Sequence, residues 1–286
     1  MRTTFLSLVC MSALTFSCSS DNDESGNDGT QDNTGINQPT ATGDFFPLAE
    51  NNEWNYNVIS TNNNDNSSAD FTDNLVVDSE NGTNYTLSAN NGAIANGTMT
   101  NFLVSGDLSA TETQLTSTGS FVIPIDGVST IEIPFSNAKF YDTAANINEV
   151  IFNTNGNLNQ DIESIPIDIT YTLKTTQLEN LDSYSVDGTS YENVTSSRIS
   201  IELGMSTTID IGPISQTLSI IDEQNVLTIT SYYADGVGLI LANANTSFEL
   251  NQSTLDLLAQ GGVDISELPT SVDIDNDQVL DSYTVN

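Results

Sequence analysis

The sequence contains no histidine, and only 4 of its 286 residues are Lys or Arg and 2 are Cys. Without histidine, catalytic pairs of Ser or Cys with His and zinc sites with His ligands are excluded. The 39 Asp and Glu residues bring the net charge to −35, which repels phosphate backbones and anionic lipid head groups. The composition therefore argues against nucleic acid or bilayer-surface binding, and favours solubility, cation binding or life in high salt.

The first residues, 1–17, have the layout of a secretory signal that is removed from the mature protein. Arg2 supplies a positive start, and residues 5–16 form a short apolar core. This core is shorter than the roughly 20 residues that a spanning helix needs. Cys10 leaves with this segment, so no disulfide is available and the fold must be stabilised by its core alone.

Cys18 follows the small residue Ser17 and precedes a polar, acidic run. This pattern resembles the bacterial lipoprotein signal, which implies that the Cys18 sulfur carries lipid and that acyl chains such as palmitate anchor the protein. Several chains bind strongly, at about 0.8 kcal/mol per buried CH₂. The alternatives are a plain cleaved signal with Cys18 as an incidental thiol, or lipidation at Cys10, which would leave almost no apolar core.

Residues 18–43 are rich in Asn, Asp, Gly and Thr, and we expect a disordered acidic tether there. Residues 19–24 resemble the acidic export signal that places some Gram-negative lipoproteins on the exterior face of the outer membrane. The alternative is that they only begin a solvated linker. The expected location is the outer membrane, with the lipid-anchored domain facing the cell exterior.

Residues 44–286 are predicted to form a single antiparallel β domain. Trp54, Tyr56 and Val58 alternate with polar residues, as in a strand with one buried face, and Trp54 is expected in the core. Asn-Gly and Asp-Gly pairs, which favour hairpin turns, punctuate the chain at 81–82, 91–92, 96–97, 126–127, 155–156 and 187–188. The sequence therefore predicts a mainly all-β fold, either a curved antiparallel sheet or half-barrel or, as the alternative, a β-sandwich.

Further strands are predicted by the same two-residue period at 71–77, 84–88, 98–104, 121–125, 130–135, 150–152, 165–174, 198–203, 207–211, 216–222, 226–233, 237–241 and 247–250. One or two short helices are expected. The first, capped by Ser253 and ended by Gly261, has about two turns. A single turn is expected at 143–148.

Three patches resemble a group of envelope lipoproteins of unknown function. These are Phe46-Pro47-Leu48 with Trp54-Asn55-Tyr56, then residues 186–194, then Tyr232-Tyr233-Ala234-Asp235-Gly236-Val237-Gly238-Leu239. The resemblance implies kinship with the periplasmic lipoprotein-carrier half-barrel, a curved sheet with an apolar concave face. Independently, the two glycines around Val237 predict a turn with positive φ or close backbone approach.

Asp273, Asp275, Asp277 and Asp281 resemble a calcium loop, because hard Ca²⁺ prefers oxygen ligands presented by a tight turn. Gln278 replaces the usual glycine and Thr284 the usual bidentate Glu. The alternative is a solvated acidic turn before a last strand at 279–285. Calcium is therefore a candidate ligand, and no cofactor is required.

Two weaker signals complete the candidate sites. Asp142-Thr143-Ala144 resembles a short bacterial O-glycosylation acceptor, with Thr143 as the modified residue. The cations Lys139, Lys174 and Arg198 are expected to pair with neighbouring acids. No catalytic residue is predicted, because no pair of carboxylates can be chosen from 39 acids.

The favoured function is a lipid-anchored, surface-exposed, non-enzymatic binding module for a protein, glycan or lipid ligand. The first alternative is a periplasm-facing carrier of lipid or lipoprotein. The second is a carboxylate-based polysaccharide hydrolase. A large apolar cavity on the concave face favours the carrier, and a cleft with two carboxylates favours the hydrolase.

Overall fold

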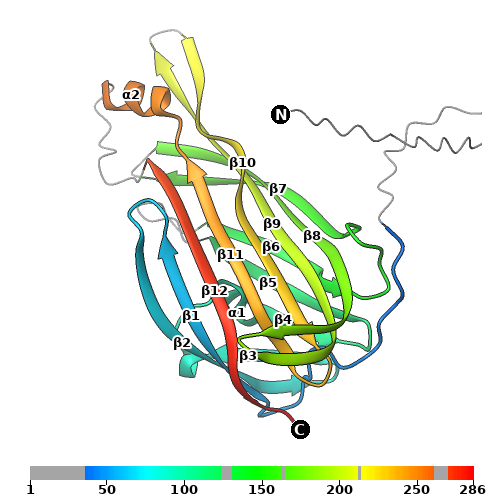
Figure 1. Cartoon of the computed structure of the whole chain (residues 1–286). Helices are drawn as coiled ribbons and strands as arrows, with labels where there is room; N and C mark the ends of the chain where they lie inside the picture. The colour runs from blue at the N-terminus through cyan, green and yellow to red at the C-terminus, as the bar shows by residue number, and fades with distance from the viewer. Residues whose placement is uncertain (1–35, 124–130, 163–164, 212–213, 261–269) are drawn as a thin grey trace, which may run out of the picture. The chain divides into compact units, whose positions relative to one another are not determined.

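One antiparallel sheet of twelve strands dominates the structure (Figure 1), a computed structural model that describes residues 36–123, 131–162, 165–211, 214–260 and 270–286. Two meanders, β1–β6 and β7–β12, are joined by the β1–β12 pair, giving the order β6-β5-β4-β3-β2-β1-β12-β11-β10-β9-β8-β7. Strands make up 71% of the structure, and the sheet is nearly closed. This confirms the predicted all-β fold with a curved antiparallel sheet.

The strands are β1 Glu53–Asn62, β2 Ser67–Asn81, β3 Asn84–Ala89, β4 Gly106–Ala110, β5 Gln114–Ile123, β6 Ile131–Asp142, β7 Val150–Ile162, β8 Ile165–Val186, β9 Thr189–Ile211, β10 Ile214–Ala234, β11 Gly238–Glu249 and β12 Ser271–Thr284. The α-helices are α1 Thr98–Val104 and α2 Gln252–Gln260. Several predicted segments are parts of one longer strand, for example 198–203 and 207–211 in β9. β4 was not predicted.

Alternation along β1 sets the two faces of the sheet. Trp54, Tyr56 and Val58 point to the concave face and are at most 1% exposed, which confirms Trp54 as a core residue. Asn55 and Asn57 point to the outer face. β1 therefore contributes an apolar row to the interior and a mostly polar row to the outside.

The three patches of the envelope-lipoprotein resemblance meet at one end of the sheet. Phe46 stacks on Trp54 with ring centroids 5.0 Å apart, and the Trp54 Nε1–H donates to the Val237 carbonyl at 2.6 Å. Gly238 has φ +110°, and a Cβ there would lie 2.8 Å from Trp54 Nε1. The predicted turn with positive φ is confirmed, since Gly236 has φ +67°.

Helix α1 lies inside the curved sheet, where the sequence predicted a strand at 98–104. Met99, Phe102 and Leu103 are at most 1% exposed, and their spacing of three and four places them on one helical face. Phe102 stacks on Phe121 of β5 with centroids 3.7 Å apart. The apolar residues of segment 98–104 also recur with the spacing of a helix. Packing against the concave face favours the helix over the predicted strand.

Polar side chains of two distant strands hold the start of α1. Asp73 on β2 accepts hydrogen bonds from the Gly97 N–H (2.6 Å) and the Asn96 N–H (2.9 Å). On β12, Asn276 accepts from the Thr98 N–H, and Gln278 bonds both the N–H and the hydroxyl of Thr100. These bonds satisfy backbone donors that a helix leaves unpaired in its first turn.

The turns and short helices of the structure match some of the local predictions and contradict others. The Asp187-Gly188 turn is confirmed, with φ values of 47° and 83°, whereas Asn155-Gly156 lies inside β7. The single helical turn expected at 143–148 is wrong, because that segment forms non-helical turns. Helix α2 is confirmed, but Asn251 rather than Ser253 caps it, accepting from the Thr254 N–H. The pair at 126–127 lies outside the described residues.

An N-terminal strap, residues 36–46, packs on the domain, so the predicted start of the folded part at Asp44 is too late. Ile36 forms an isolated β-bridge with Ile147. Gln38 bonds the backbone of Ala145, Leu178 and Asn180. The strap therefore ties the β6–β7 connection to β8. The predicted tether before residue 36 lies outside the described residues.

Candidate functional site

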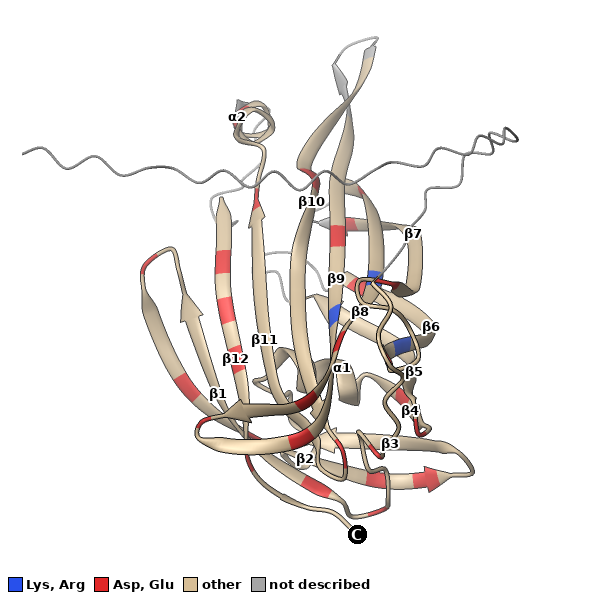
Figure 2. Cartoon of the chain, turned by 45° about the vertical axis from the view of Figure 1, so that its right-hand side comes forward, with Lys and Arg blue, Asp and Glu red and all other residues tan. Residues whose placement is uncertain are grey.

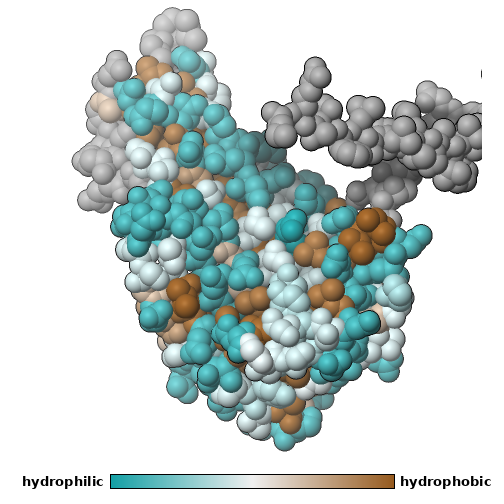
Figure 3. Space-filling model, viewed as in Figure 1, coloured by the Kyte–Doolittle hydropathy of each residue, from teal (hydrophilic) through white to brown (hydrophobic). Residues whose placement is uncertain are grey.

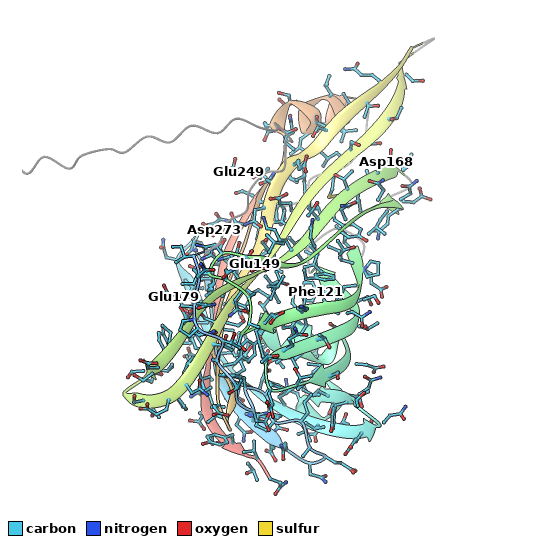
Figure 4. The ribbon with its side chains drawn as sticks, turned by 90° about the vertical axis from the view of Figure 1, so that its right-hand side faces the viewer. Phe121, Glu149, Asp168, Glu179, Glu249 and Asp273 are labelled. Carbon is cyan, nitrogen blue, oxygen red and sulfur yellow. The ribbon has the colours of Figure 1, made fainter. Side chains whose placement is uncertain are left out.

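The chain's own side chains fill the concave face. The largest buried side chains are Trp54, Tyr56, Tyr141, Tyr233, Phe45, Phe46, Phe102, Phe121, Phe140, Phe248, Leu75 and Met99. In the side view of Figure 4, Phe121 lies on one side of strands β10 and β11, and Asp273 and Glu179 lie on the other. Because these side chains fill the interior, the outer face is where a ligand can contact the sheet.

The end of the β8–β9 hairpin forms a flap, residues 181–194, across the outer face (Figure 2). The last residue of β9 paired with β10 is Val194, opposite Ala234, and beyond it the hairpin leaves the sheet. Tyr184 of the flap stacks on Tyr232 of β10, with ring centroids 4.3 Å apart and planes 9° apart. This aromatic contact fixes the base of the flap to the sheet.

A pocket of about 370 Å³ lies at the base of the flap. It is lined by Ile147, Asn148, Leu178, Glu179, Leu181, Ser183, Tyr184, Ser196 and Tyr232. Apolar side chains, two aromatic rings, short hydroxyl and amide groups and the carboxylate of Glu179 thus converge in one open depression, the combination typical of sites for small polar ligands.

Tyr232 is the central side chain of this flap pocket. Burial, followed by hydrogen bonding to Tyr184 and by the charges of Tyr184 and Glu179, raises its pKa, whereas Arg198 opposes the shift. Tyr232 therefore stays neutral at physiological pH. Its ring offers an apolar surface, and its hydroxyl can donate and accept hydrogen bonds.

Figure 2 colours the few Lys and Arg positions of the chain blue. One of them, Arg198, follows the pocket-lining residue Ser196 by two positions on β9. Among the described residues the only ion pair joins Lys139 to Asp142, at 2.6 Å. The prediction of pairing with acids is therefore confirmed for Lys139 and wrong for Lys174 and Arg198 within the described chain. Arg198 faces Thr176 and Lys174 faces Ser200, so the two cations are diagonal neighbours on one face. Diagonal Cβ atoms lie about 7–8 Å apart.

The four candidate calcium ligands lie on β12 and not in a loop. Because β12 runs from Ser271 to Thr284, Asp273, Asp275 and Asp277 alternate onto its outer face. The expected acidic turn is therefore wrong. Gln278, which occupies the position of the calcium-loop glycine, is fully buried and holds α1.

Asparagine side chains of neighbouring strands and of the β1–β2 turn donate hydrogen bonds to these carboxylates. The Asn245 amide donates to both Asp273 and Asp275 at 2.9 Å, and Asn63 also donates to both. Asn243 donates to Asp277 at 2.6 Å, and Asn57 contacts Asp281 at 3.4 Å. Hydrogen bonds from Asn63 and Asn245 lower the pKa of Asp275.

Calcium binding at these four residues stays a prediction. An ion shared by Asp273 and Asp275 would have to displace the amide of Asn245, which lies between the two carboxylates. Among the residues that the structure describes, no group of three or more Asp, Glu, Cys or His side chains is placed to hold a metal.

Thr143 is fully buried, and its hydroxyl donates to the Ala41 carbonyl of the strap. An O-glycan at Thr143 would therefore have to be attached before the strap packs, and the modification stays a prediction. Cys18 lies outside the described residues. Within the described part of the chain, no helix has the length and apolar character needed to cross a membrane.

Two further pockets lie elsewhere on the surface. A groove of about 510 Å³ at the tip of the flap includes Asp187, Asp277 and Phe71, whose side chain is 43% exposed. A pocket of about 530 Å³ includes Asp44 and Glu112. Burial and the charge of Asp235 raise the pKa of Asp44.

Comparison with known proteins adds no assignment. No family model matches the chain, and neither a curated protein nor a solved structure matches it. The envelope-lipoprotein resemblance therefore stays a prediction. The first and third of its patches pack around Trp54, and the second contacts the third through the hydrogen bond from Asn193 to Asp235.

Sequence reasoning missed the flap pocket, although two signals were present. Tyr232 and Tyr233 are adjacent on one strand, so alternation requires one ring to face outward. Arg198 is one of only 4 basic residues, which makes its position informative. The contact of Tyr184 with Tyr232 depends on the bend of the β8–β9 hairpin across the sheet. No local sequence pattern predicts that bend.

Proposed function

We propose that this chain is a lipid-anchored outer-membrane lipoprotein that faces the cell exterior, and that its β domain is a non-enzymatic binding module for a glycan. The flap pocket is the binding site. The observation that carries the proposal is the aromatic pair Tyr184–Tyr232, partly exposed beside short hydroxyl and amide side chains. Ring faces and hydroxyl groups are what a saccharide presents to such a surface.

The anchored location rests on Cys18 and its sequence context. Removal of residues 1–17 and lipidation of Cys18 leave an acidic linker before the strap. Two measurements test this part: the mass of the mature amino terminus, expected to carry acyl chains, and protease treatment of intact cells, expected to degrade the domain. An unmodified terminus, or a domain that survives on intact cells, contradicts it.

Glycan binding is tested with the purified domain, from residue 19 onward, on a panel of oligosaccharides. Tyr232→Ala is expected to lower affinity at least roughly 10-fold, because a buried aromatic contact contributes about 1.5–3 kcal/mol. Phe71→Ala, an aromatic truncation in the flap-tip groove, is the matched control and is expected to bind as the parent does. Equal losses in both variants, with intact folding by circular dichroism, contradict the flap pocket as the site.

The carrier alternative has less support, because α1 and aromatic side chains fill the concave face where lipid would enter. The hydrolase alternative is favoured by one observation, the pair Asp44 and Glu112 in one pocket, since an acid with a raised pKa suits proton donation. If the chain hydrolyses a polysaccharide, Asp44→Asn abolishes release of reducing ends and leaves binding at the flap pocket intact.

A further inference from the structure

Basic residues are so scarce in this chain that their placement carries information. After the predicted signal only Lys139, Lys174 and Arg198 remain. Lys139 has a structural task, since it pairs with the buried carboxylate of Asp142 at 2.6 Å. Lys174 and Arg198 form no ion pair with any described residue, although 39 acids are available.

Both unpaired cations lie on the outer face, Arg198 next to the flap pocket and Lys174 farther along β8, roughly 13 Å by strand rise from the lining residue Leu178. Arg198 follows the lining residue Ser196 by two positions on β9, and its charge acts on Tyr232. Lys174 lies diagonally across from Arg198 on β8. Hydroxyl and amide side chains are paired with these cations across the strands: Thr176, Ser200, Thr230 and Asn153.

We infer that the ligand of the flap pocket is an acidic saccharide, a sugar chain bearing carboxylates, and that Arg198 and Lys174 bind its carboxylates while Tyr232 contacts a sugar ring. This inference rests on the proposed function and names its ligand class. Arg binds carboxylates through two parallel N–H donors, and Lys adds a compact positive charge.

The net charge of −35 does not prevent this recognition. The pocket lining contains one carboxylate, Glu179, against the two cations Arg198 and Lys174 on the same face. At physiological ionic strength the Debye length is about 8 Å, so acids farther away are largely screened. Two cations about 7–8 Å apart act within this distance of a carboxylate held between them. The same acidity opposes non-specific adsorption of anions elsewhere, which leaves this patch as the favoured point of contact.

A saccharide fits the patch better than an acidic peptide does. The strands here present short hydroxyl and amide groups in fixed positions, which match the hydroxyl groups of a sugar chain. The open pocket of about 370 Å³ beside them has room for a sugar ring against Tyr232. A peptide rich in carboxylates offers few hydroxyl groups to this surface.

The test measures binding of uronate oligosaccharides to the domain by calorimetry. The same oligosaccharides after carboxyl reduction give neutral probes of equal length, and poly-glutamate gives an acidic peptide. We expect the uronates to bind at least roughly 10-fold more tightly than both other probes, with affinity falling as salt increases. Arg198→Gln and Lys174→Gln should each lower the affinity for uronates about 10-fold.

Ile94→Asp is the matched control, because it makes the same change in net charge at a side chain that is 87% exposed. It is expected to bind uronates as the parent does. Equal affinity for reduced and unreduced sugars, or unchanged binding by Arg198→Gln, overturns the acidic ligand while glycan binding stands. Tight poly-glutamate binding overturns the saccharide class. Binding of no sugar at all overturns the proposed function as well.

Discussion

The inward and outward side chains of β12 are both polar, but they have different roles. Asn276 and Gln278 point inward, are at most 8% exposed, and hold the first turn of α1. Asp275 and Asp277 point outward, where they accept hydrogen bonds from the amides of Asn245 and Asn243. The face of the molecule seen in Figure 3 is mostly hydrophilic, with scattered hydrophobic residues. A polar residue in the interior is therefore a structural element here, whereas the outer face is where ligand contacts are available.

Truncation of a side chain that fills the concave face is expected to have the largest effect on the free energy of unfolding. Phe102→Ala should lower the free energy of unfolding by about 3–5 kcal/mol, because it removes a fully buried ring that stacks on Phe121. Phe71→Ala, at a ring that is 43% exposed, should lower it by at most about half as much. Urea titration measures both. Equal losses would mean that the interior is not packed as described.

The second-largest loss of stability is expected when the buried carboxylate of Asp73, which holds the start of α1, is removed. Asp73→Ala leaves the Asn96 and Gly97 N–H groups without their acceptor, and we expect a loss of about 2–4 kcal/mol. The outer-face control Asp277→Ala should cost about 0.5 kcal/mol or less, since that carboxylate is exposed. If both substitutions cost the same, the contrast between the two faces of the sheet fails.

The asparagine–aspartate contacts of the outer face predict a small, pH-dependent effect. The pKa of Asp275 is lowered in the folded chain, so its stabilising contribution is present above the unfolded value of 3.8 and is lost as pH falls through the folded value. Asp275→Asn should cost about 0.5 kcal/mol or less at pH 7 and nothing once the parent's Asp275 is protonated. Urea midpoints at pH 7 and below pH 3 measure this difference.

The Asp275→Asn variant also tests calcium binding. If calcium raises the melting temperature of the parent and not of Asp275→Asn, the metal binds at the β12 carboxylates. A gain of equal size in both proteins places calcium elsewhere.

The smallest expected effect has the opposite sign. Burial and the neighbouring Asp235 raise the pKa of Asp44, so its ionisation opposes folding above the unfolded value of 3.8. Asp44→Asn should therefore stabilise the domain at pH 7 by about 0.3 kcal/mol or less, because solvent screens the exposed pair. The gain should vanish in acid, where both carboxyls are protonated. Thermal unfolding at two pH values detects it, and destabilisation at pH 7 contradicts it.

Local patterns predicted much of the fold. Alternation identified β1 and the inward position of Trp54, and the Asp187-Gly188 pair identified the turn between β8 and β9. These features depend on neighbours within a few residues. Segment 98–104 was misassigned because its apolar residues satisfy both periods, and the choice between them depends on Asp73 and Gln278, far away in the chain.

The candidate site was less accessible from sequence, because its parts come from separate strands. The acidic run on β12 attracted attention through spacing alone, yet its Gln278 faces the interior and its carboxylates bond to asparagines. Tyr184, Tyr232 and Arg198 come together only because the β8–β9 hairpin bends across the sheet after its pairing with β10 ends.

By itself the sequence determined a chain of alternating strands with an extreme negative charge and almost no bases, because side-chain period and composition are local properties. Only the tertiary structure decided which alternate row faces the filled interior and which faces water. Curvature and strand register, set by contacts between distant segments, assign each polar side chain its partner.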